Sequence, residues 1–218
     1  MVKNPRKPKQ PLVRKPEDII PFQDPLWRIH KTKGDFALPW NALRAWGPNS
    51  TCRFDPHPAG APAVDPHYAV MYAGTDPLTA VIEVSQERRV VDTRTGDPAL
   101  TSWTPTRPLC LLDLMTTDRD GTVKPDNWCL RNGASASLPS ATKDICRNWA
   151  HAIRTQFPDV DGLHTPSTMT GAPTVVLFSR ASNSFPGRPG FSRFLDSDEM
   201  VAVVTGELTA HEISFKVV

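Results

Sequence analysis

The 218-residue chain lacks the features that most directly mark a membrane protein or a common enzyme class. It has no run of about 18 apolar residues, and its basic N-terminus is not followed by an apolar segment, so we expect neither a membrane span nor a secretory signal. It also has no G-x-x-x-x-G-K-[ST], G-x-G-x-x-G, G-x-S-x-G or H-E-x-x-H motif. Any catalytic chemistry must therefore come from side chains spread over several elements, in a protein that we expect in the cytoplasm.

Cysteine is scarce, and none of the four cysteines lies in a C-x-x-C pair. We expect four reduced thiols that mostly fill the core, with Cys110 in the apolar run LCLLDL as the clearest case. A zinc site could be drawn from Cys52, His57 and His67, but no fourth ligand is evident. We therefore expect no metal.

Acidic residues are absent from residues 1–16, which hold six Lys/Arg and four Pro. The rest of the chain has 19 basic and 23 acidic residues, so the net charge of +2 arises from this segment. Its composition predicts a flexible, basic, Pro-rich arm over residues 1–20, followed by a single domain over 21–218. Such an arm could instead bind nucleic acid, a membrane surface or an acidic partner.

The 23 prolines divide the chain into short elements, and more strands than helices are expected. The predicted strands lie at 24–30, 68–73, 88–92, 108–115, 174–179, 200–205 and 212–218. A short helix is expected after Asp76-Pro77, an N-cap followed by proline at the first helical position. The clearest helix is 140–157, with apolar residues at helical spacing and Pro158 behind it. Without regular strand–helix alternation, this pattern favours an α+β fold.

Polar residues interrupt apolar or small-residue stretches at a few places. Arg28 lies in LWRIH, Arg53 in CRF, and Ser167 in GLHTPSTMTG before a predicted strand. Tyr72 and Glu83 lie eleven residues apart in MYAGTDPLTAVIEV. Taken singly, each is explained as a surface charge, a core aromatic or a turn residue. On a helical wheel Glu83 points away from the apolar face of its helix, which suits either solvent or the wall of a cleft.

In their order and spacing, these segments resemble the RES domain family, named for its Arg, Glu and Ser residues. The resemblance runs from about Leu26 to Phe178, and its most specific piece is YAGTDPLTAVIE. Where the family often has a Gly-Arg-Trp-Asn-like run, this chain has CRFDPH. His57 in that loop is therefore a further candidate beside Arg53.

The resemblance implies a fold like that of ADP-ribosyltransferases, with a split mixed or antiparallel sheet and a few flanking helices. It also implies an enzyme that consumes NAD+ as a substrate, typically as the toxin of a toxin–antitoxin pair. The implied catalytic residues are Glu83, Tyr72 and Arg53. Those implied to bind NAD+ are Arg28, Arg53, Tyr72, His57 and Ser167.

The acceptor of the ADP-ribosyl group is left open by the sequence. Water would make the protein a glycohydrolase and phosphate would make it a phosphorylase, and we favour these small acceptors over a protein side chain. The resemblance further implies a helix-turn-helix antitoxin, through which alone nucleic acid would be contacted, and a homodimer is conceivable. The alternatives are a non-enzymatic nucleic-acid-associated module that uses the basic arm, and a relative that keeps the fold without the activity.

Overall fold

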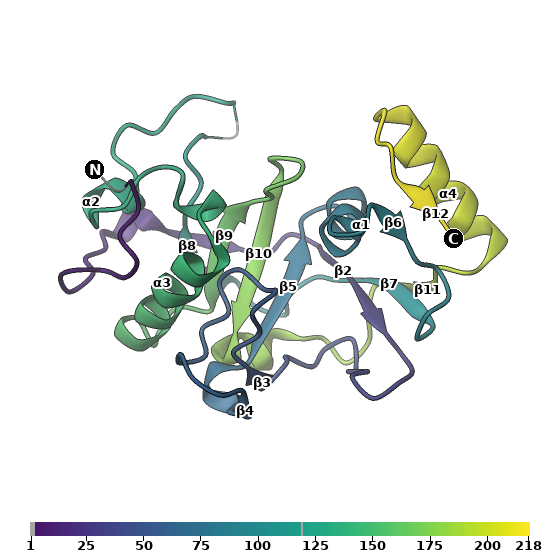
Figure 1. Cartoon of the computed structure of the whole chain (residues 1–218), viewed down its shortest axis with the longest axis horizontal. Coiled ribbons are helices and arrows are strands. Elements are labelled where there is room, and N and C mark those ends of the chain that lie inside the picture. Colours follow the sequence, from purple (N-terminus) through teal and green to yellow (C-terminus); the bar gives the residue numbers. More distant parts are fainter. Residues whose placement is uncertain (1–2, 119) are drawn as a thin grey trace.

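The computed structural model describes residues 3–118 and 120–218, and its centre is a mixed sheet of eight strands (Figure 1). The strand order is β1-β8-β9-β10-β5-β2-β7-β11, with β8 and β9 parallel and the other neighbours antiparallel. The strands are β1 (Ile19–Phe22), β2 (Leu26–Lys31), β5 (Val70–Gly74), β7 (Pro98–Trp103), β8 (Leu109–Asp113), β9 (Gly162–Pro166), β10 (Pro173–Phe178) and β11 (Phe191–Phe194). The predicted α+β class with a mixed sheet is confirmed.

The sheet divides between β2 and β5. Within the described chain these two strands share a single registered pair, Trp27 with Gly74. By contrast, β2 is paired with β7 over six residues and β5 with β10 over five. The strands therefore diverge on either side of one contact, so the sheet is split into a five-stranded and a three-stranded part, and side chains at the split can face an open space.

Helices and short strands surround the sheet (Figure 1). They are α1 (Pro77–Ser85), α2 (Trp128–Arg131), α3 (Lys143–Gln156), α4 (Asp198–Ala210), and the short pairs β3 (Trp46–Gly47) with β4 (Ala63–Val64) and β6 (Val90–Val91) with β12 (Lys216–Val217). Helix α3 packs Trp149 and Ile153 against Leu163 and Val176 of the larger part of the sheet. Helices α1 and α4 share a second core with the smaller part. In the described residues, no helix is long and apolar enough to cross a membrane.

Local signals in the sequence placed α1 and α3 well. The Asp76 carboxylate accepts a hydrogen bond of 2.7 Å from the Thr79 amide, and Pro77 begins α1, as predicted. Helix α3 begins three residues later than predicted, because residues 138–140 form a separate 3-10 turn.

The prediction of a strand at 200–205 is wrong, because these residues lie inside α4. The valines in this segment suggested a strand, but Ser197 caps a helix here. Met200, Val204 and Leu208, spaced four residues apart, form the buried side of this helix. The predicted strand at 212–218 shortens to β12, which pairs in parallel with β6 outside the main sheet.

The expected burial of Cys110 is wrong. Cys110 is exposed, because it lies on the solvent side of β8 while its neighbours on either side are buried. Strand β1 begins at Ile19, inside the segment expected as an arm, and residues 3–15 contact α2 and α3.

Candidate active site

A cavity of about 530 Å³ lies where β2 and β5 diverge. Its walls come from both strands, α1, residues 51–54, the start of α3 and the ends of β9 and β10. Arg28, Arg53, Tyr72 and Glu83 all line it, although they come from four separate segments. The split of the sheet therefore brings together four of the six residues singled out in the sequence.

Helix α1 carries Glu83 into this wall. The chain turns from β5 into α1 at Gly74, where a Cβ atom would lie 2.9 Å from the Ala80 nitrogen and 2.9 Å from the Asp76 oxygen. Only glycine permits this close approach of strand and helix. The tight turn fixes how α1 sits on β5, and so fixes the position of Glu83 relative to Tyr72.

The Glu83 carboxylate is held by two donors. Ser167 Oγ donates to Oε1 at 2.5 Å, and Gln86 Nε2 donates to Oε2 at 3.0 Å and to the Glu83 carbonyl at 2.9 Å. Ser167 Oγ also accepts the amides of Met169 and Thr170, at 3.1 and 3.0 Å, which directs its proton toward Glu83. Ser167 is thus joined to the site through Glu83 and is itself buried.

Tyr72 lies on β5 and its ring packs against the core beneath α3. Its hydroxyl donates a hydrogen bond of 2.7 Å to the Arg53 carbonyl. Burial, with Cys52 and Asp55 nearby, raises the pKa of Tyr72 well above its usual value. The phenol therefore keeps its proton and serves to hold the ring and the Arg53 backbone in place.

Two guanidinium groups line the cavity without a carboxylate partner among the described ion pairs, those of Arg28 and Arg53. Arg28 donates to the carbonyls of Trp40 and Ala42, at 3.2 and 3.3 Å, and burial lowers its pKa to about 10. The Arg53 guanidinium donates to the Ala141 carbonyl. Since a partly buried cation without a counter-ion favours a bound anion, this part of the cavity suits phosphate groups.

His57 does not line the cavity, so the structure does not bring it together with the other candidate residues. Its ring is buried, with Nδ1 2.6 Å from Asp55 Oδ1 and Nε2 2.9 Å from the Ala45 carbonyl. Asp55 also accepts from Arg44 at 2.9 Å and from the Asn49 amide at 2.7 Å. His57 therefore helps to hold the 49–57 loop together, and the loop in turn carries Arg53.

Sequence reasoning missed other residues that line the cavity, including Gln86, Lys143 and Thr168. Gln86 could have been found, since it lies three residues after Glu83, at the C-cap of the same helix. Lys143 begins α3, and nothing in the local sequence shows that this end of the helix meets Arg53. Across the described residues, no group of three or more His, Cys, Asp or Glu side chains could hold a metal ion.

Comparisons with known proteins identify the family of the chain. The model of the RES domain matches residues 25–191, a range that contains Arg28, Arg53, Tyr72, Glu83 and Ser167. A chain in the crystal structure of the M. tuberculosis MbcT–MbcA toxin–antitoxin complex is 16% identical, with a TM-score of 0.52 over 86% of this chain and 92% of that chain. At that identity the likeness shows the fold alone. No curated protein sequence matches. With more than half of its length matched, the chain belongs to the RES domain family.

Proposed function

We propose that this protein cleaves the nicotinamide–ribose bond of NAD+, with water or phosphate as the acceptor. One observation carries the proposal. A carboxylate held by two donors, Glu83, shares a cavity with the guanidinium groups of Arg28 and Arg53, for which the described residues supply no carboxylate partner. NAD+ presents the complementary groups, a pyrophosphate and a ribose that becomes cationic when nicotinamide leaves.

Glu83 acts where positive charge develops. When the bond breaks, its electron pair leaves with nicotinamide, and the ribosyl carbon becomes an oxocarbenium-like cation. The Glu83 carboxylate stabilises this cation by its charge and by accepting a hydrogen bond from a ribose hydroxyl. Water then adds to the cation and releases a proton, which gives ADP-ribose, whereas phosphate would give the 1-phosphate of ADP-ribose.

The other residues bind and orient the substrate. Arg28 and Arg53 pair with the pyrophosphate, because a guanidinium can bond two oxygens at once. The Tyr72 ring stacks on nicotinamide and holds the bond in a reactive pose. Ser167, expected to contact phosphate or ribose directly, is instead assigned to orient Glu83, because its proton is directed there.

In the cell we propose the role of a cytoplasmic toxin held in check by an antitoxin. The RES family and the fold shared with a chain of a toxin–antitoxin complex support this role. The family further suggests a helix-turn-helix antitoxin, and a homodimer is compatible with it. If a protein side chain were the acceptor, the same cleavage would make the chain a mono-ADP-ribosyltransferase.

The test is to incubate the purified protein with NAD+, with and without phosphate, and to identify the products. We expect release of nicotinamide, with ADP-ribose or its 1-phosphate as the second product, and loss of both in Glu83→Gln. Expression should also lower cellular NAD+ and arrest growth, with relief by Tyr72→Ala. Stable NAD+ in both experiments would refute the proposal, and salt-dependent binding of nucleic acid without NAD+ turnover would favour the alternative module.

A further inference from the structure

The basic N-terminal segment lies outside the matched residues 25–191, yet it is tied to the body of the protein at several points. We propose that residues 3–15, here called the N-terminal strap, hold in place the wall of the cavity that binds the Arg53 side chain. Affinity for the substrate would then depend on a segment that does not itself line the cavity. This inference rests on the proposed function, because it concerns the same site.

The first anchor of the strap is Asn4, whose side chain is 8% exposed. Its Oδ1 accepts from the Ser135 amide at 2.9 Å and from the Ser135 hydroxyl at 3.0 Å. Its Nδ2 donates to Ser137 Oγ at 3.2 Å. One side chain thus fixes the turn that leads directly into residues 138–140 and then α3.

The second anchor satisfies a buried donor on α3. Trp149 is 0% exposed, and its Nε1 donates to the Pro5 carbonyl at 2.9 Å. Asn148 Nδ2 donates to the next carbonyl, that of Arg6, at 3.0 Å. Without the strap the indole N–H would lose its acceptor, and a buried donor without an acceptor destabilises the fold.

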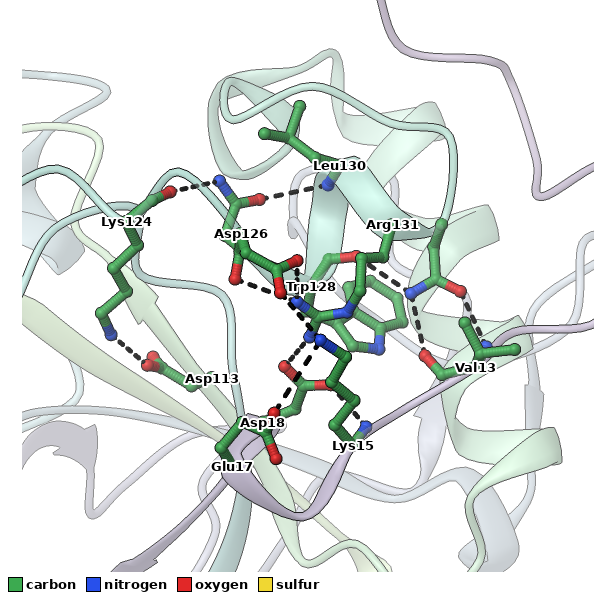
Figure 2. A network of polar contacts seen from close by, with 12 residues as sticks. Val13, Lys15, Glu17, Asp18, Asp113, Lys124, Asp126, Trp128, Leu130 and Arg131 are labelled. Atoms are coloured by element: carbon green, nitrogen blue, oxygen red, sulfur yellow. Dashed lines mark hydrogen bonds and ion pairs between the residues drawn. The ribbon is translucent and has the colours of Figure 1, made fainter.

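The far end of the strap is fixed to α2 and to the end of α3. Leu12 is buried, and its amide donates to Gln156 Oε1 at 2.7 Å. Val13 exchanges two hydrogen bonds with Asn132, at 2.8 and 2.9 Å. Figure 2 shows how Lys15 joins a polar network that includes Asp126. The strap is therefore held at both ends, by residues 4–6 and by residues 12–15.

Much of the positive charge of the strap is used within the molecule. Arg14 pairs with Asp159 at 2.5 Å and Lys15 with Asp126 at 2.8 Å, while Arg6 lies 3.9 Å from Asp144. In Figure 2, Arg131 connects Asp126 to Asp18. Three of the six cations thus complement acidic groups of the body.

The strap contacts residues that flank 138–143 in the sequence, and residues within 138–143 line the cavity or bind Arg53. Asn4 and Pro5 hold Ser135, Ser137 and Trp149, which lie on either side of residues 138–143. Within that segment, Pro139 and Lys143 line the cavity, and the Ala141 carbonyl accepts a hydrogen bond from Arg53. Cys146, in the first turn of α3, is 0% exposed. Its thiol donates to the Leu138 and Ala141 carbonyls, at 3.4 and 3.5 Å. Loss of the strap contacts should therefore loosen the support of Arg53 and expose Cys146.

The test compares Asn4→Ala with Asn4→Asp and with the control Lys9→Ala, all in full-length protein. Asp would keep the bonds accepted from Ser135, and the Lys9 side chain is exposed and makes no described contact. We expect KM for NAD+ to rise about tenfold in Asn4→Ala with kcat within about twofold, less in Asn4→Asp, and not at all in the control. Ser137→Ala, a milder change at the same contact, should act in the same direction if Asn4→Ala does not fold.

A second readout does not depend on NAD+ turnover. In a Cys110→Ser background, which removes the exposed thiol, iodoacetamide labelling of Cys146 is followed by peptide mass spectrometry. Faster labelling in Asn4→Ala than in Lys9→Ala is expected. If the wild type consumes no NAD+, the proposed function fails while labelling still tests the strap. Unchanged labelling overturns the strap, and faster labelling with unchanged KM overturns its link to substrate affinity.

Discussion

The Ser167 hydroxyl lies 2.5 Å from Glu83 Oε1 and ties the loop after β9 to helix α1. Because Ser167 Oγ accepts two backbone amides, its single proton has one direction left, toward the carboxylate. We predict that Ser167→Ala lowers kcat for NAD+ cleavage about tenfold, or about 1.4 kcal/mol, with little change in KM. Steady-state kinetics measure this split. A serine control is Ser50→Ala, an exposed side chain with no described hydrogen bond, and a change in KM alone would show that Ser167 binds substrate instead.

Replacing the carboxylate itself should have the larger effect. Glu83→Gln keeps the shape of the side chain but removes the charge that stabilises the ribosyl cation. We expect the rate to fall at least about a hundredfold, or about 2.7 kcal/mol. Single-turnover release of nicotinamide measures it directly.

The matched control is Glu207→Gln on the exposed side of α4, where the carboxylate lies 3.8 Å from His211 Nε2. No residue of α4 is among those that line the cavity. It should cleave NAD+ like the wild type. Near-wild-type cleavage by Glu83→Gln would remove Glu83 from the chemistry.

Two substitutions at Tyr72 distinguish the contribution of the ring to cleavage from that of the hydroxyl. Tyr72→Phe loses one hydrogen bond, to the Arg53 carbonyl, so cleavage should stay within about fivefold of the wild type. Tyr72→Ala removes the stacking surface and should lose more than tenfold, as about 1–3 kcal/mol of stacking is removed. Since burial raises the pKa of Tyr72 well above its usual value, the two pH–rate profiles of wild type and Tyr72→Phe should run parallel up to about pH 10. A drop in wild-type activity near pH 9 that Tyr72→Phe lacks would contradict this.

The sequence predicted best those parts of the site that rest on local signals. Asp76-Pro77 marked the start of α1, and that start placed Glu83 relative to Tyr72. The helical wheel correctly left Glu83 off the apolar face. What lies opposite Glu83 depends on the split between β2 and β5, which is a property of strand pairing between distant segments and has no local sequence signal.

The features that the sequence did not show have the same origin. His57 stood beside Arg53 in a Pro/Ala-rich loop, and nothing local showed that Asp55 and Ala45 would occupy both of its ring nitrogens. The flexible arm was predicted from composition alone, and composition does not show that the buried Trp149 N–H donates to the Pro5 carbonyl. In α4, β-branched residues suggested a strand, but the Ser197 cap and tertiary burial decided for a helix.

Arg28 should contribute to binding more than to chemistry. Arg28→Ala removes a partly buried cation that lines the cavity at the proposed pyrophosphate site, so KM for NAD+ should rise about thirtyfold, the equivalent of about 2 kcal/mol. Arg28→Lys keeps the charge, but an ammonium group cannot bond the Trp40 and Ala42 carbonyls and two phosphate oxygens at the same time. Its KM for NAD+ should therefore lie between those of the wild type and Arg28→Ala. Calorimetry measures the affinity for NAD+ of Arg28→Ala and Arg28→Lys, each made in the Glu83→Gln background so that NAD+ is not cleaved during the measurement. Arg94→Ala, an exposed arginine, serves as the control, and equal affinity of all three variants would exclude Arg28 from the binding site.

The buried Asp55 should make stability depend on pH. Burial alone would raise its pKa, but the Asn49 amide, Arg44 and His57 outweigh it, so the pKa of Asp55 is lowered. A carboxyl with a depressed pKa in the folded state stabilises the protein above its unfolded value of 3.8, and this contribution is lost as the pH falls through the folded pKa. At pH 7, Asp55→Asn should therefore lower the free energy of unfolding by about 3 kcal/mol, because Arg44 is left without its partner.

Urea unfolding of the wild type and Asp55→Asn at a series of pH values measures this contribution. The difference in free energy of unfolding between the two proteins should be largest near neutral pH. It should become smaller below about pH 4, because the wild-type carboxyl is then protonated and is neutral, like the amide of Asn. Asp35→Asn, at an exposed site without described contacts, should show no gap at any pH. Since Asp55 holds the loop that carries Arg53, the same variant should raise KM for NAD+, and a stable protein with unchanged KM would contradict the assignment of this loop to the cavity wall.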